Sequence, residues 1–163
     1  MFGFVLAYIG FVSFTGLAKT RTQRKQLYLL RKEWKLNEIR VLIFLNKFKT
    51  IVKYAENGAL SLSSDGITKE LNRNDNEYRE LTKRFDDLMG KTKDFANEIS
   101  SNSWILLYKK SVQRHNDLVD YEDYFKLSFI NNYARYRKRL LKVLNDIRSR
   151  EGLPVIIDMR LII

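Results

Sequence analysis

The apolar residues of this chain recur at steps of three and four over three long runs, and this spacing constrains the fold more than any other feature. Residues three or four apart lie on one face of an α-helix, so each run predicts one helix with a single buried face. The chain has one proline, Pro154, and seven glycines. Sandwiches and barrels need frequent turns, which consume glycine and proline. The small number of these helix-breaking residues therefore favours long helices.

We predict helices at about residues 19–57, 67–99 and 104–150. The first ends at Asn57-Gly58, and the third ends at Glu151-Gly152 with Pro154 beyond it. Both sequences are typical helix stops. Serine-rich segments at residues 58–66 and 100–103 predict the two loops. The predicted buried positions are Leu27, Leu30, Trp34, Val41, Leu45, Phe48, Val52 and Ala55 in the first helix; Ile67, Leu71, Asn74, Tyr78, Leu81, Phe85, Leu88, Thr92, Phe95 and Ile99 in the second; and Trp104, Tyr108, Val112, His115, Leu118, Phe125, Phe129, Tyr136, Leu140, Val143 and Ile147 in the third.

Helices of this length bury their apolar faces most economically against two neighbours. The predicted fold is therefore all-α, an antiparallel three-helix bundle with a coiled-coil-like body over residues 19–152. The apolar, β-branched residues 153–163 predict an extended tail docked on the bundle or on a partner. Because no helix stop follows Ala18, we expect the N-terminal segment to continue into the first helix.

Residues 1–18 carry no charge, and seven Lys or Arg follow within residues 19–35. As a helix the uncharged segment would span roughly 25–27 Å, a short but admissible membrane crossing. We therefore predict one transmembrane anchor with its N-terminus outside and the basic body in the cytoplasm, or in the matrix of an organelle. Two alternatives stay open. The segment is either a cleavable signal peptide ending at Gly16-Leu17-Ala18 or a buried helix of a soluble bundle.

The net charge of +11 gathers in two segments. Basic residues just inside a membrane span attract anionic headgroups by roughly 1 kcal/mol each. This predicts a collar that binds acidic phospholipid, made of Lys19, Arg21, Arg24 and Lys25. The second cluster consists of Arg135, Arg137, Lys138, Arg139 and Lys142, of which Arg135, Arg139 and Lys142 share one helix face. It is interpreted either as a phosphate-contacting patch or as a solvated helix face.

We find no set of residues in the sequence that specifies a chemistry. There is no cysteine, which excludes disulfides and thiol catalysis. His115 is the single histidine, and of the acids at residues 117–123 only Glu122 shares its helix face, too few ligands for a metal site. We therefore interpret His115 as a histidine of the helix interface. No phosphate-binding loop, nucleophile elbow or zincin motif is present, so we predict no enzyme activity, cofactor or metal.

Two families resemble the layout in outline. Residues Ile9-Gly-Phe-Val-Ser-Phe14 and the basic residues after them resemble the peripheral-stalk b subunit of an ATP synthase. The b subunit has one continuous helix, whereas this sequence has two predicted helix breaks. The layout of an N-terminal anchor before a helical bundle also resembles the LemA family. The segment Arg114-His-Asn-Asp-Leu-Val-Asp-Tyr121 resembles the C-terminal signature of that family, except that the spacing to the tyrosine differs by one residue. Neither resemblance assigns a function.

The pattern as a whole predicts a single-pass membrane-anchored helical scaffold or assembly subunit. It would bind protein partners, or further copies of itself, through its helical seams and acidic lipid through the basic collar. The alternative is a membrane-anchored nucleic-acid-binding protein that uses the basic cluster at residues 135–142.

Overall fold

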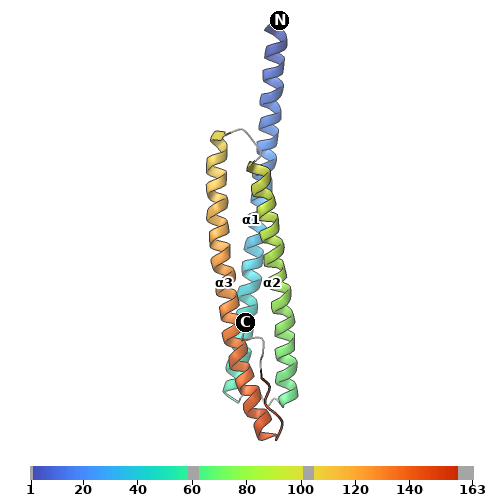
Figure 1. Cartoon of the computed structure of the whole chain (residues 1–163), viewed down its shortest axis with the longest axis vertical. Helices are drawn as coiled ribbons and strands as arrows, with labels where there is room; N and C mark the ends of the chain where they lie inside the picture. The colour runs from blue at the N-terminus through green and yellow to red at the C-terminus, as the bar shows by residue number, and fades with distance from the viewer. Residues whose placement is uncertain (1, 59–62, 101–104, 158–163) are drawn as a thin grey trace. The chain divides into compact units, whose positions relative to one another are not determined.

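The computed structural model describes the backbone of residues 2–58, 63–100 and 105–157, and the side chains of residues 21–58, 63–98 and 123–157. It contains three helices, α1 (Phe2–Glu56), α2 (Ser64–Ser100) and α3 (Ile105–Arg150) (Figure 1). Within the described residues there is no strand. The three helices pack against one another, so the prediction of an all-α bundle of three helices is confirmed.

Helix α1 is one continuous element from Phe2 to Glu56. The uncharged N-terminal segment and the first predicted helix are therefore parts of the same helix, as the missing stop signal after Ala18 predicts. The helix ends where Gly58 adopts a φ of 64°, a left-handed conformation that glycine reaches without a Cβ penalty. The predicted stop at Asn57-Gly58 thus acts through the backbone freedom of glycine.

Helix α3 ends in a Schellman motif around Gly152, whose φ is 71°. The Gly152 N–H donates to the Ser149 carbonyl at 3.2 Å, and the Leu153 N–H donates to the Arg148 carbonyl at 2.8 Å. These two bonds satisfy carbonyls that the end of a helix leaves without an internal donor.

Helix α2 begins at Ser64, before the predicted start at residue 67. Ser63 explains the earlier start, because its Oγ accepts a hydrogen bond from the Gly66 N–H at 3.3 Å. A serine in this position is an N-cap, and it satisfies one of the free N–H groups of the first turn. The predicted loop at residues 58–66 is shortened accordingly.

The chain divides into two compact units, which are described separately. Unit 1 comprises Met1–Leu36 and Asp86–Tyr121, and unit 2 comprises Asn37–Phe85 and Glu122–Ile163. In unit 1 the described side chains come from α1 and α2. The indole N–H of the buried Trp34 donates to Thr92 Oγ1 at 3.1 Å, and Lys91 Nζ lies 2.6 Å from Glu33 Oε2. Thr92, a polar residue at a predicted buried position of the seam, is therefore the hydrogen-bond partner of a buried indole.

Aromatic rings of α1 and α3 form the core of unit 2. The ring centroid of Phe44 lies 6.1 Å from that of Phe129, and the centroid of Phe48 lies 5.7 Å from that of Tyr133. The residue numbers of both partners rise together, so these parts of α1 and α3 run parallel. Phe44 also stacks on Tyr133, with centroids 6.2 Å apart. Close offset ring pairs of this kind add to the free energy that burial alone provides.

Helix α2 runs antiparallel to α3 in unit 2. At one end the ring centroid of Phe85 lies 6.0 Å from that of Phe125. At the other end the Ser64 N–H donates to Glu151 Oε1 at 3.4 Å. The order of the three helices is therefore up, down and up, which short loops between consecutive helices require.

Where side chains are described, most of the predicted buried positions are buried, with differences at single positions. The side chains of six predicted positions lie outside the described residues: Ile99, Trp104, Tyr108, Val112, His115 and Leu118. On α1 the buried residue is Phe44, and the predicted Leu45 is half-buried. On α3 Tyr133 and Leu144 are buried, and the predicted Val143 is half-buried. Where two apolar residues are adjacent in the sequence, either one can be the buried residue, and the two choices differ by a rotation of about 100° around the helix axis. The ring pairs of the core decide the choice.

The described part of the tail, residues 153–157, has no helix or strand and lies against the end of α3. The Ile156 N–H donates to Asn145 Oδ1 at 2.9 Å, and the Ile156 carbonyl accepts from Asn145 Nδ2 at 3.0 Å. Arg148 Nε donates to the Pro154 carbonyl at 2.8 Å. Asn145 and Arg148 therefore hold the first residues of the tail, and residues 158–163 lie outside the described part.

Over residues 21–58, 63–98 and 123–157, no helix is both long enough and apolar enough to cross a membrane. The predicted transmembrane anchor at residues 1–18 lies outside these residues, and the structure gives the prediction no support.

Candidate functional site

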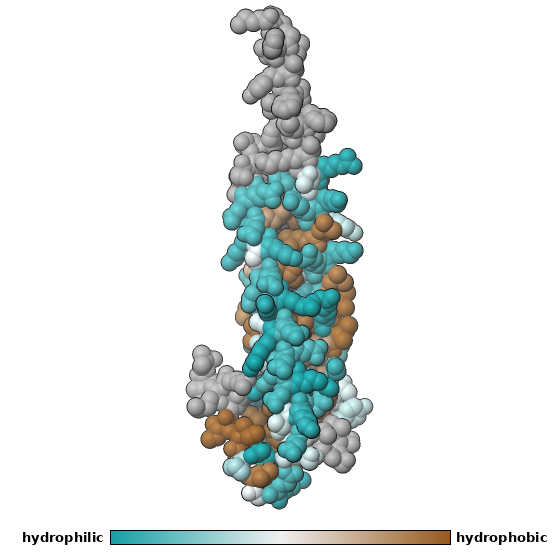
Figure 2. Space-filling model, turned by 90° about the vertical axis from the view of Figure 1, so that its right-hand side faces the viewer, coloured by the Kyte–Doolittle hydropathy of each residue, from teal (hydrophilic) through white to brown (hydrophobic). Residues whose placement is uncertain are grey.

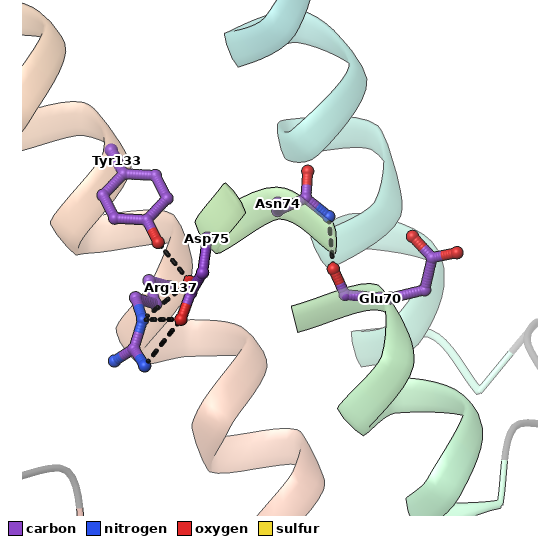
Figure 3. Close-up of polar contacts among 5 residues, drawn as sticks. All are labelled: Glu70, Asn74, Asp75, Tyr133 and Arg137. Carbon is purple, nitrogen blue, oxygen red and sulfur yellow. Dashed lines mark hydrogen bonds and ion pairs between the residues drawn. The ribbon is translucent and has the colours of Figure 1, made fainter. Parts of the chain in front are cut away.

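A carboxylate lies buried between α2 and α3 in unit 2. Asp75 of α2 accepts hydrogen bonds from two residues of α3 (Figure 3). Arg137 Nε lies 3.0 Å from Asp75 Oδ1, and Arg137 Nη2 lies 3.1 Å from Oδ2, so the guanidinium binds both oxygens. The Tyr133 hydroxyl donates to Oδ1 as well. We call Asp75, Tyr133 and Arg137 the buried triad.

The local sequence explains how the buried triad assembles. Tyr133 and Arg137 are four residues apart, so both side chains leave the same face of α3. The ring of Tyr78, one turn after Asp75 on α2, stacks on the Tyr133 ring with centroids 3.7 Å apart and planes at 8°. The side-chain amide of the neighbouring Asn74 donates back to the Glu70 carbonyl of its own helix at 2.7 Å (Figure 3).

The environment fixes the protonation of the donors. Burial, with the hydrogen bond to Asp75 and the negative charge of that residue, raises the pKa of the Tyr133 hydroxyl well above its ordinary value. Burial works against the charge of Arg137, but the hydrogen bonds and charge of Asp75 outweigh it and raise the pKa of Arg137. Tyr133 therefore remains a neutral donor, unsuited to act as a base. The buried triad is a structural contact between two helices.

The raised pKa of Tyr133 predicts a specific loss of stability in alkali. A group whose pKa is higher in the folded state stabilises the fold fully below its unfolded value, about 10 for tyrosine, and this stabilisation is lost as the pH rises further. We expect the free energy of unfolding to fall between about pH 10 and 12 more steeply in the wild type than in Tyr133→Phe. Urea unfolding followed by circular dichroism measures both slopes.

Tyr54→Phe provides the control for this comparison, because Tyr54 is exposed. Its alkaline slope should match that of the wild type. Equal slopes for all three proteins would contradict the assignment of the buried hydroxyl.

The predicted basic cluster at residues 135–142 is split between surface and core. Arg137 is 9% exposed and belongs to the buried triad, whereas Arg135, Lys138, Arg139 and Lys142 are exposed. Arg135 Nη2 lies 2.6 Å from Asn132 Oδ1, and Arg139 binds the Glu56 carboxylate of α1 with two nitrogens. The Arg139 hydrogen bond lowers the pKa of Glu56, and Glu56 raises the pKa of Arg139. One of the five predicted phosphate-binding residues is therefore in the core, and another holds a carboxylate.

The predicted lipid-binding collar lies on unit 1. Arg21, Arg24 and Lys25 are exposed, and the side chain of Lys19 lies outside the described residues. His115 also lies outside them. Where side chains are described, no group of three or more His, Cys, Asp or Glu is arranged to hold a metal ion.

Helix α1 has a second apolar face in unit 2. Ile39, Leu42, Ile43 and Tyr54 are 44–62% exposed. At about 100° per residue they lie on the side of α1 opposite the buried Phe48. We call these four residues the outer row. Apolar side chains are also visible on the surface in Figure 2, among hydrophilic ones. The core of unit 2 therefore does not use all the apolar surface of α1.

Sequence reasoning missed Asp75 and the outer row. The signal for Asp75 was present, because it lies four residues after Leu71 and three before Tyr78, in step with a seam. A carboxylate at such a position needs a buried cation. The signal for the outer row was the pair of apolar residues Leu42-Ile43 beside the predicted seam.

No family model, curated protein or solved structure matches this chain.

Proposed function

We propose that the protein is a single-pass membrane-anchored helical scaffold, an assembly subunit that binds other proteins through an exposed helical face. The outer row carries this proposal. A helix that only has to fold needs one apolar face, and α1 buries that face through Phe44 and Phe48. A second apolar face on the same helix favours a partner helix, because contiguous exposed apolar residues typically mark interaction sites.

The membrane part of the proposal rests on charge. Residues 1–18 have none, and the collar residues Arg21, Arg24 and Lys25 that follow them are exposed. Exposed cations next to an apolar helical segment attract anionic headgroups and set the orientation of a span. Nucleic-acid binding finds less support, because Arg137 is buried and Arg139 holds Glu56.

Site-specific photocrosslinking in native membranes tests the scaffold. The full chain carries a photoreactive residue at Ile43 in one variant and at Lys83, an exposed position of α2 in the same unit, in another. We expect discrete protein adducts from position 43 and few from position 83, because only the first lies in the outer row. A membrane complex supplies the same partner in every copy, so the adduct should have one dominant mass.

The membrane anchor is tested on the same samples by alkaline carbonate extraction. The full chain should stay in the membrane pellet, and a chain without residues 2–18 should move to the supernatant. Adducts that are equally strong at both positions would contradict the scaffold, and complete release of the full chain by carbonate would contradict the anchor.

A further inference from the structure

Cations flank the outer row on both sides. With a rotation of about 100° per residue, Arg40 and Lys47 lie on one side of the outer row and Lys49 lies on the other. Lys53 lies at the end of the row. All four are exposed. The ion pairs found among the described side chains involve none of them. Glu56, the last residue of α1, binds Arg139.

Two residues of the outer row, Ile39 and Ile43, belong to a run of α1 that has the spacing of a coiled-coil seam, and Leu42 and Tyr54 lie beside this seam. Ile39, Ile43, Asn46 and Thr50 follow one another at steps of four, three and four, which are the a and d positions of a heptad. In that register Arg40 and Lys47 occupy e positions, and Lys49 occupies a g position. Charges at e and g determine which helix a seam accepts.

We propose that the outer row binds an amphipathic α-helix of another protein whose apolar seam is flanked by aspartate or glutamate. This inference rests on the proposed scaffold function and names the chemistry of the partner. Acidic residues at the e and g positions of the partner would neutralise Arg40, Lys47 and Lys49 while its apolar residues cover Ile39 and Ile43. Asn46 and Thr50 would set the register, because polar residues in a seam select one alignment.

A second copy of the chain fits this face less well. Two outer rows in contact would bring the e and g cations of both copies together without a carboxylate between them, and like charges across an interface oppose binding. Helix α2 offers acids, but within the described residues none of its large apolar side chains is among the exposed ones. Helix α2 of a second copy could therefore neutralise the cations, but it has no exposed large apolar side chains among the described residues to cover the outer row.

A bilayer surface also fits less well. A helix lying in the membrane interface needs a wide, continuous apolar face, whereas polar residues interrupt this face of α1 between Ile43 and Tyr54. The polar Asn46 and Thr50 lie between Ile43 and Tyr54 in the sequence, and Thr50 Oγ1 donates to the Asn46 carbonyl at 2.9 Å. These polar groups suit a helix–helix contact, in which a seam residue can meet a polar partner.

Two designed helical peptides test the proposal by fluorescence anisotropy against the full chain in detergent micelles. Both have about four heptads with isoleucine at a, leucine at d and one asparagine at a central a position. One peptide has glutamate at every e and g position and the other has lysine. We expect the glutamate peptide to bind at least about tenfold more tightly than the lysine peptide. This preference should weaken as salt is added, because the flanking charges are exposed.

Variants of the outer row give the decisive comparison. Ile39→Ser combined with Ile43→Ser should weaken binding of the glutamate peptide at least about tenfold. Reversing Arg40, Lys47 and Lys49 to glutamate should transfer the preference to the lysine peptide. The matched control combines Tyr124→Ser and Leu127→Ser, which removes exposed apolar side chains of α3 in the same unit and should leave binding unchanged. Circular dichroism checks that every variant keeps its helical content.

Several results would overturn the proposal. They are failure of both peptides to bind, an unchanged preference after charge reversal, or equal losses in the α3 control. If the serine variants instead abolish self-association in light scattering, the face binds a second copy. If they abolish only adsorption to phosphatidylserine vesicles, it binds lipid. If position 43 gives protein adducts but neither peptide binds, the proposal of an acidic partner helix is wrong and the proposed scaffold function is not affected.

Discussion

Replacing Asp75 with alanine is expected to lower the free energy of unfolding by about 3–5 kcal/mol. The reason is the guanidinium of Arg137, which is held within hydrogen-bond distance of both Asp75 oxygens and is 9% exposed. Without the carboxylate a buried positive charge loses its main compensation, and its desolvation is no longer offset. Urea unfolding of the full chain, followed by far-ultraviolet circular dichroism, measures the loss.

Removal of both charges separates the ion pair from the packing around it. Asp75→Leu combined with Arg137→Met should change the free energy of unfolding by less than about 1 kcal/mol or increase it, because buried ion pairs are often replaceable by apolar residues of similar volume. The exposed pair of Glu33 and Lys91 in unit 1 is the matched surface control, and Glu33→Ala should cost less than about 1 kcal/mol. If Asp75→Ala costs no more than Glu33→Ala, the buried triad is solvated and the assignment is wrong.

Replacing Phe48 with alanine is expected to have an effect of similar size, about 3–5 kcal/mol. Phe48 is 0% exposed, and its ring centroid lies 5.9 Å from that of Phe44, 5.7 Å from Tyr133 and 6.2 Å from Tyr136. These rings come from two helices, so they cannot close on the space that the missing ring leaves without moving α1 against α3. Urea unfolding gives the loss, and the near-ultraviolet dichroism of the tyrosines should decrease in the same variant.

Tyr124→Ala is the control for Phe48→Ala, because it removes an aromatic ring from a position of α3 that is 74% exposed. Surface substitutions of this kind usually change the free energy of unfolding by less than about 0.5 kcal/mol. Equal losses for the two variants would mean that the aromatic cluster does not form the core of unit 2.

The Phe48 prediction and the proposed partner site concern opposite sides of α1. In unit 2 the side that carries Phe48 is closed by α3, and the side that carries Ile43 remains open. Substitutions on the buried side should therefore reduce stability, whereas substitutions on the outer row should reduce partner binding and leave stability nearly unchanged. A scaffold needs this separation, because its binding face can vary without loss of the fold.

The number and approximate extent of the helices could be predicted because they depend on local signals. Periodic apolar residues specify a helix with one buried face, and Gly58 and Gly152 end helices through the backbone conformations that they alone adopt easily. The start of α2 was harder, because Ser63 is one of several nearby serines that could act as the cap. The role of Arg137 could not be predicted, because the charge pattern of α3 does not distinguish the buried cation from the exposed ones.

Local sequence signals are sufficient to predict that the chain is all-α, that it forms three helices, and that its first helix includes the uncharged N-terminal segment without a break. These properties follow from residues a few positions apart. Three other properties become visible only when the helices are packed: Arg137 is the cation of residues 135–142 that enters the core, Tyr133 and Arg137 share one carboxylate, and α1 keeps a second apolar face exposed. Each of these depends on which helix faces which, and that choice is made by packing between residues far apart in the chain.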